Sequence, residues 1–147
     1  MLKLRDDFNL PGMKILQFAW GDEMPQNDYM PHNYARNFIA YTGTHDNNTT
    51  LGWYRQEGKP HHQQIEHYVG RELSEHDIWW VMARLAYASV AKTAILPMQD
   101  VLGIDEQGRM NTPGQGQGNW GWRLVPGQIT KETENQLKEW TWLYNRD

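Results

Sequence analysis

The chain has 147 residues, enough to bury a core as one domain, and a net charge of −4 from 14 basic and 18 acidic residues. It has no dense basic patch, which argues against a nucleic-acid partner, and no cysteine, which excludes disulfides and thiolate metal ligands. Its apolar runs are far shorter than the roughly 20 residues that cross a bilayer, and its N-terminus lacks the apolar core of a signal peptide. We therefore expect a soluble protein of the cytoplasm or a plastid, with no membrane partner.

The aromatic residues are mostly those that carry a polar group. Eight Trp and seven Tyr are present, against three Phe. Trp and Tyr combine an apolar ring face with a hydrogen-bonding group, which suits the C–H faces and hydroxyl edges of sugar rings. The same residues suit a half-buried core, and composition leaves both interpretations open.

Two short strands joined by a long irregular connection are predicted first along the chain. Residues 13–18 follow a Leu-Pro-Gly turn and alternate between apolar and polar side chains, which predicts a strand. Residues 19–34 are interrupted by Gly, Pro and Asn, and a connection of this length is typical of a loop with a function. Phe38–Tyr41 is the second predicted strand.

The second strand runs directly into a cluster of small and hydrogen-bonding residues at 42–50, which includes His45 and Asp46. In parallel α/β folds, chemistry is found where the carboxyl end of a strand meets its loop. Asp46 is therefore the first candidate for a catalytic residue. The alternative is that Asp46 or Asn47 only caps the following helix, because both side chains accept hydrogen bonds from free helix amides. Spacing alone does not decide between the two.

Two short helices are predicted at residues 48–56 and 60–71. The second contains His61, His62 and His67. These side chains do not share one helix face as a His-x-x-x-His pair would. They therefore favour a solvated surface over a metal site.

The best-defined helix begins at a capping box of the sequence Ser-Glu-His-Asp at residues 74–77. Apolar and small residues then recur at spacings of three and four, which predicts a helix packed on a sheet. This face contains Ile78, Trp79, Met82, Leu85, Ala86, Ser89 and Val90. Residues 93–98 are a third predicted strand, with Gln99 and Asp100 at its carboxyl end. Strands that flank a helix in this way are typical of a βαβ unit with parallel strands.

A loop rich in Gly, Asn and Trp is predicted at residues 110–123. Its alternate glycines do not have the spacing of a dinucleotide-binding or Walker phosphate loop. We expect a mobile loop that closes over an extended ligand, and the alternative is a surface loop whose two Trp residues pack into the core. Residues 130–146 predict a terminal amphipathic helix capped by Thr130.

Four ordered motifs resemble one known family. The run Thr-Gly-Thr-His-Asp-Asn at residues 42–47 closely resembles the signature of the 4-alpha-glucanotransferases (amylomaltase or disproportionating enzyme), glycoside hydrolase family seventy-seven. Three further blocks agree in order, at residues 11–20, 31–34 and 99–120. The resemblance covers nearly the whole chain.

The resemblance implies an α/β fold of the TIM (β/α)8 barrel type, of which residues 1–147 would be the C-terminal portion in a single segment. Residues 13–18, Phe38–Tyr41 and 93–98 would be the sixth, seventh and eighth strands, so the chain would contain about the last three strand–helix units. Such a portion is incomplete as an independent barrel. We expect its open sheet edges to promote self-association.

The resemblance also implies a retaining enzyme with three acidic residues, two of which act as nucleophile and acid/base. The third acid matches Asp46. The family's nucleophile motif, of the Arg-x-Asp-His type, and its acid/base motif, of the Glu-Asp-Leu-Gly type, are both missing from this sequence. We therefore expect a C-terminal piece that has no transferase activity by itself. Asn48 and Leu51 stand where many members carry Asp and Arg.

By resemblance, the activity is transfer of α-1,4-glucan segments between malto-oligosaccharides, in starch or glycogen metabolism, with no metal ion and no organic cofactor. Asp46 would be the catalytic residue, holding the 2- and 3-hydroxyls of the transferred sugar, and His45 would bind the same sugar. The substrate-binding residues of the acceptor side would be Trp20, Asn111, Pro113 and Gly114. The alternative function is a non-catalytic starch- or glucan-binding module, or a vestigial truncated product.

Overall fold

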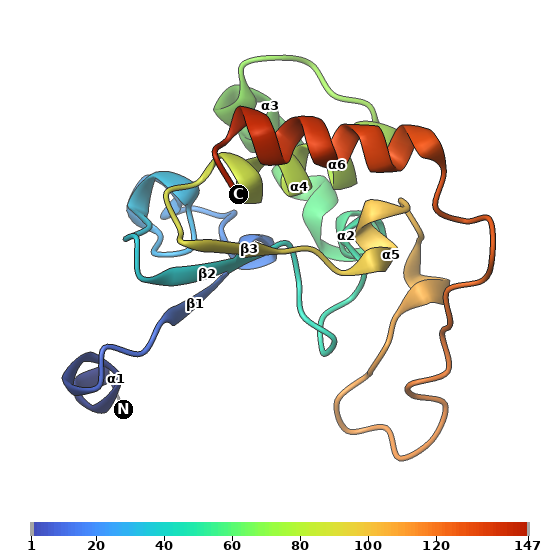
Figure 1. Cartoon of the computed structure of the whole chain (residues 1–147), viewed down its shortest axis with the longest axis horizontal. Coiled ribbons are helices and arrows are strands. Elements are labelled where there is room, and N and C mark those ends of the chain that lie inside the picture. The colour runs from blue at the N-terminus through green and yellow to red at the C-terminus, as the bar shows by residue number, and fades with distance from the viewer. Residues whose placement is uncertain (1, 147) are drawn as a thin grey trace.

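A parallel three-stranded sheet forms the centre of the chain, whose computed structural model describes residues 2–146 (Figure 1). The strands are β1 (Gly12–Ile15), β2 (Phe38–Tyr41) and β3 (Thr93–Ile95). They lie in the order β1-β2-β3, and both pairs are parallel. The predicted βαβ unit, in which a helix connects the parallel second and third strands, is confirmed.

The bounds of β2 match the prediction, but the other two strands are shorter than predicted. β1 ends at Ile15, and residues Leu16–Phe18 form a 3-10 turn in which Leu16 and Gln17 are both buried. The period-two pattern therefore overstated the strand, because side chains in a turn do not alternate between two faces. β3 ends before Pro97, which has no N–H to donate to a ladder.

Helical segments lie before β1, between β2 and β3, and after β3. The helix α1 (Leu2–Asp7) comes before β1 and was not predicted. After β2, the short helix α2 (Thr50–Trp53) continues through a π-turn at Tyr54–Gly58 and a 3-10 turn at Lys59–His61 into α3 (His62–Val69). The two predicted helices are thus one nearly continuous helical path. The helix α5 (Met98–Val101) follows β3 directly, where a longer strand was predicted.

The helix α4 (Ile78–Ala88) packs on the sheet as predicted. Ile78, Met82 and Ala86 have no exposed surface and belong to the same core cluster as Ala40 of β2. Val90 is 62% exposed, because the helix ends two residues before it. The predicted apolar face is therefore correct within the helix and wrong beyond its end.

The terminal helix α6 (Lys131–Leu143) is capped by Thr130, whose hydroxyl oxygen accepts a hydrogen bond from the Thr133 amide. Its buried Trp140 packs on Trp80 of α4, with ring centroids 4.3 Å apart. Helices α3, α4 and α6 lie on the same side of the strands (Figure 1). Within residues 2–146, no helix is long and apolar enough to span a membrane.

The other face of the sheet is open. Met13 of β1 and Ile95 of β3 are 54% and 42% exposed, although both are large apolar side chains. In the part of the chain that the structure describes, β1 and β3 each pair on one side only. Self-association through these edges stays a prediction.

The capping box of the 3-10 turn Glu75–Asp77, which leads directly into α4, gives a testable contribution to stability. The Asp77 carboxylate accepts hydrogen bonds from the hydroxyl and the backbone N–H of Ser74, at 2.6 and 2.8 Å. These bonds, the hydroxyl first, lower the pKa of Asp77 to about 2. Because the folded pKa is depressed, the stabilisation is fully present above the ordinary Asp pKa and is lost as the pH falls through about 2.

We expect Ser74→Ala to lower the free energy of unfolding by about 1 kcal/mol at pH 5 and by clearly less near pH 2. Urea unfolding at both pH values measures the difference. Ser74→Thr keeps the hydroxyl and is the matched control, with a loss well below that of the alanine variant. An alanine effect that is independent of pH would show that the hydroxyl bond to Asp77 does not stabilise the fold.

Candidate active site

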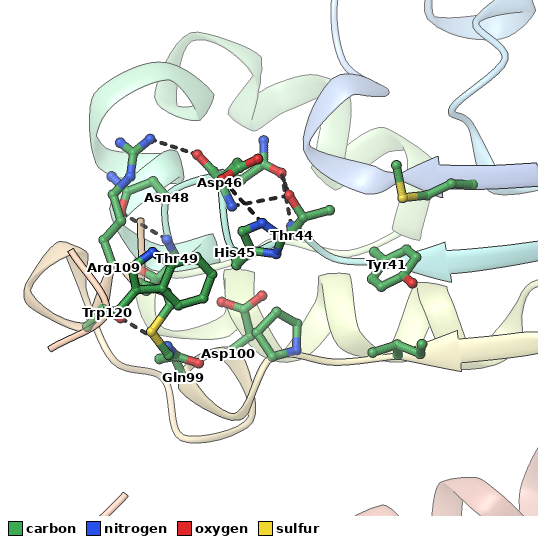
Figure 2. A pocket seen from close by; sticks show the side chains of 17 residues that line it. Tyr41, Thr44, His45, Asp46, Asn48, Thr49, Gln99, Asp100, Arg109 and Trp120 are labelled. Carbon is green, nitrogen blue, oxygen red and sulfur yellow. Dashed lines mark hydrogen bonds and ion pairs between the residues drawn. The ribbon is translucent and has the colours of Figure 1, made fainter. Parts of the chain in front are cut away.

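A pocket of about 440 Å³ lies at the carboxyl end of the sheet (Figure 2). One wall is loop 43–49, which follows β2, and another is formed by residues that follow β3, from Pro97 to Asp100. Residues 108–110 and Trp120 also line it, together with Met13, Tyr41 and Ile95 of the strands. The predicted location of the site, where strands meet their loops, agrees with this cavity.

Asp46 lies on the wall of this pocket with its carboxylate half exposed. The amide Nδ2 of Asn111 donates to Asp46 Oδ1 at 2.6 Å, and His45 Nε2 lies 3.3 Å from the same oxygen. The carboxylate is therefore held through one oxygen by neutral or weakly basic groups, in contact with solvent. An exposed, oriented carboxylate of this kind can accept hydrogen bonds from ligand hydroxyl groups.

The capping interpretation of Asp46 and Asn47 is wrong. The cap of α2 is Thr49, whose side chain accepts a hydrogen bond from the Gly52 amide at 3.1 Å. Asn47 instead accepts hydrogen bonds from the N–H and hydroxyl of Thr44, which folds the loop back on itself. The Asp46 side chain therefore does not cap the helix and instead lines the pocket.

An aromatic pair stands beside the carboxylate. The rings of His45 and Trp120 lie 5.1 Å apart at an interplanar angle of 39°. Trp120 is 52% exposed, so the alternative that this Trp packs into the core is not what the structure shows. Figure 2 shows both rings on the pocket wall. Exposed ring faces next to hydrogen-bonding groups suit a ligand with C–H faces and hydroxyl edges.

Arg109 joins the two segments that carry these side chains. Its guanidinium donates to the carbonyl oxygens of Asp46 and Asn111, both at 2.9 Å. The backbone N–H of Asn111 donates to the His45 carbonyl at 3.0 Å. Sequence reasoning missed Arg109 because its partner Asp46 is 63 positions away and no local pattern connects them.

The predicted loop residues Pro113 and Gly114 are exposed beyond Asn111 and do not line the pocket. The loop is folded on Asn119, which accepts from the Thr112 amide at 2.9 Å and donates to the Gln115 carbonyl at 2.8 Å. Gly114 has φ +85, a conformation that side chains other than Gly rarely adopt. Closure of this loop over a ligand stays a prediction.

Trp20 lies apart from the pocket. It is 8% exposed, belongs to the hydrophobic core cluster and meets Tyr68 edge to face, with ring centroids 5.9 Å apart. Of the two interpretations of the high Trp content, packing in a half-buried core is the one that fits Trp20. Contact of Trp20 with a ligand stays a prediction that this geometry does not support.

A second carboxylate, Asp100, borders the pocket but is only 1% exposed. It accepts hydrogen bonds from the Thr42 hydroxyl and from both the N–H and the hydroxyl of Thr50. Burial raises the pKa of Asp100, and these hydrogen bonds act in the opposite direction. The sequence placed Asp100 at a strand end but assigned it no role.

The three histidines of the second helix do not gather at a site. His62 bonds to the Tyr54 hydroxyl at 2.8 Å and lies 3.1 Å from a Glu66 carboxylate oxygen, so it is a half-buried structural residue rather than a solvated one. His67 is exposed, as predicted. Across residues 2–146, no group of three or more His, Asp or Glu side chains is arranged to hold a metal ion.

Comparisons with known proteins agree with these motifs. A family model described as 4-alpha-glucanotransferase matches residues 1–129. A 4-alpha-glucanotransferase of Synechocystis sp. is 46% identical over 97% of this chain and 28% of its own length. A chloroplastic/amyloplastic 4-alpha-glucanotransferase of Oryza sativa is 39% identical over 99% of this chain and 25% of its own length.

A solved structure gives the same result for the fold. The amylomaltase from Streptococcus agalactiae in complex with acarbose superposes with a TM-score of 0.91 at 38% identity. The match covers 99% of this chain and 29% of that one. The chain thus spans between a quarter and a third of the length of these relatives.

Proposed function

This chain belongs to the 4-alpha-glucanotransferase family, and on that premise we propose that it is part of an enzyme that transfers α-1,4-glucan segments between malto-oligosaccharides. Residues 1–147 would form the C-terminal portion of a catalytic (β/α)8 barrel. The three parallel strands in sequential order, with helices on one side and a pocket at their carboxyl ends, support this placement.

The observation that carries the proposal is the Asp46 carboxylate, held by Asn111 at 2.6 Å beside the His45–Trp120 pair. As a glucose ring flattens toward an oxocarbenium ion, its 2- and 3-hydroxyls become stronger hydrogen-bond donors. A fixed carboxylate that accepts from them binds the transition state more tightly than the ground state. Asp46 would act in this way.

The reaction would proceed in two displacements. A carboxylate nucleophile attacks the anomeric carbon while the acid/base protonates the leaving 4-oxygen. The 4-hydroxyl of an acceptor glucan then attacks the glycosyl-enzyme and returns its proton to the acid/base. We propose that both of these carboxylates come from parts of the enzyme outside this chain. Further strands would pair with the outer edges of β1 and β3 and close the barrel, and the open sheet face with Met13 and Ile95 would then face its interior.

The structure supports the other predicted substrate-binding residues to different degrees. Asn111 touches Asp46 directly, so it fits a role at the site. Pro113 and Gly114 follow it in the same exposed loop, where they would be accessible to an acceptor sugar. Trp20 is buried in the core, so its side chain would have to become exposed before it could contact a substrate. The relatives include bacterial and plastid proteins, which supports a cytoplasmic or plastid location.

The test is transfer with maltotriose by the complete protein that carries this chain. We expect glucose together with longer maltodextrins, separated by chromatography, and no requirement for an added metal ion. The alternative is a non-catalytic glucan-binding module. Binding of maltoheptaose by calorimetry without any change in chain length would favour that alternative and overturn the transferase proposal.

A further inference from the structure

The two ends of the loop that carries His45 and Asp46 both contact one buried carboxylate, that of Asp100. Thr42 immediately precedes loop 43–49 and Thr50 immediately follows it, and neither has any exposed surface. The Asp100 carboxylate accepts the Thr42 hydroxyl at 2.5 Å, the Thr50 N–H at 2.7 Å and the Thr50 hydroxyl at 2.8 Å. One side chain from α5 therefore links the two ends of the loop, and Gln17 adds bonds to the carbonyls of Thr42 and Asn48.

The chemistry of these contacts requires a carboxylate. Burial of a charge costs free energy, and apolar side chains of similar volume often stabilise a core as well or better. An amide offers one acceptor oxygen, whereas a carboxylate offers two, and here Oδ1 and Oδ2 both accept. Three donors converge on Asp100 from both ends of one loop, so these contacts fit a role in the geometry of the loop.

The neighbouring residue of α5 holds the opposite wall. Gln99 is 7% exposed, and its Nε2 donates to the Gly108 carbonyl at 3.1 Å. Gly108 precedes Arg109, which reaches back to the Asp46 carbonyl. Figure 2 shows Gln99 and Asp100 at the base of the pocket, below Arg109 and Asp46. The short helix α5 thus supports both segments that meet at Asp46.

We propose that Asp100 is a positioning residue, which sets the placement of the Asp46 carboxylate in the transfer reaction by holding both ends of loop 43–49. The proposal rests on the proposed function. It differs from a purely structural role in that Asp100 would act on the reaction through Asp46. A carboxylate displaced by about 1 Å from the reacting sugar can lose on the order of 10²-fold in rate.

The first experiment measures maltotriose transfer by the complete protein. We expect Asp100→Asn to lower kcat by about tenfold or more with a much smaller change in KM, since the loss is in transition-state positioning. Thr42→Val should lower kcat as well, and Thr42→Ser, which keeps the hydroxyl, should restore it. Asp77→Asn, at the start of α4, is the control for lost stability with unchanged kcat.

A double-mutant cycle separates positioning from structure. If Asp100 acts through Asp46, then Asp100→Asn added to Asp46→Asn lowers kcat by much less than it does alone. Equal effects in the two backgrounds, or a kcat of Asp100→Asn within twofold of the parent, would overturn the proposal. If Asp100→Asn does not fold, the Thr42→Val and Thr42→Ser pair decides in the same cycle.

The second experiment does not depend on catalysis. Hydrogen exchange of the protein should show faster exchange of the amides of residues 43–49 in Asp100→Asn, with the amides of α6 unchanged. Absence of transfer by the parent protein, together with this local change, would reject the proposed function while keeping the contact as a loop anchor. Unchanged exchange in residues 43–49 would reject the positioning role itself.

Discussion

Asp46→Asn in the complete enzyme is expected to lower kcat for maltotriose transfer by about 10²-fold or more, while glucan binding falls much less. The substitution keeps the size of the side chain and can keep a hydrogen bond with Asn111, which now lies 2.6 Å from Oδ1. It removes the negative charge. The loss therefore falls on the interaction that strengthens as the sugar becomes cationic.

Two measurements are needed for this variant. Single-turnover or initial-rate kinetics give kcat, and calorimetry with maltoheptaose gives the binding free energy. Asp77→Asn is the matched control, because it removes a carboxylate that does not line the pocket and should leave kcat unchanged. Near-normal turnover by Asp46→Asn would remove Asp46 from the mechanism, whatever its effect on stability.

The 147-residue chain by itself is expected to show no transfer. A retaining reaction needs a nucleophile and an acid/base with carboxyl groups about 5–5.5 Å apart. In the described part of the chain, the carboxylates that line the pocket are Asp46 and Asp100. Asp100 is 1% exposed and both its oxygens already accept hydrogen bonds from Thr42 and Thr50. Asp46 alone cannot supply both roles.

The measurement is product formation from maltotriose with the purified chain at high concentration and long incubation. The same preparation carrying Asp46→Asn controls for a contaminating host enzyme. Glucose and longer maltodextrins formed by the parent chain and not by the variant would contradict the prediction. Such a result would require Asp46 to act as a nucleophile or acid/base rather than as the third acid.

Local patterns in the sequence were sufficient to predict the main elements. The β2 strand, the helix α4 with its Ser74 cap and the Thr130 cap of α6 depend on side chains within a few positions of each other. Periodicity and capping chemistry report such short-range interactions directly. The carboxyl edge of the sheet as the place of the pocket also followed, because parallel strands bring their loops to one edge.

The ends of the strands were predicted less accurately than their locations in the sequence. Residues Leu16–Phe18 continue the apolar pattern of β1 but turn away from the sheet, where Gln17 donates to the Asn48 carbonyl at 2.9 Å. The partner of Gln17 lies 31 positions away. No local pattern contains that contact, so the strand was predicted too long.

By itself, the sequence determined the strand–helix order, the family and the candidacy of Asp46, since these depend on residue types in consecutive positions. Only the tertiary structure decided that Asp46 is anchored by Asn111 rather than used as a cap, that Trp20 lies in the core, and that Asp100 holds both ends of the loop. These contacts join residues 50 to 65 positions apart or depend on which side chains the core buries. Contacts of this kind depend on how the whole chain packs, so they cannot be predicted from the spacing of residues along the sequence.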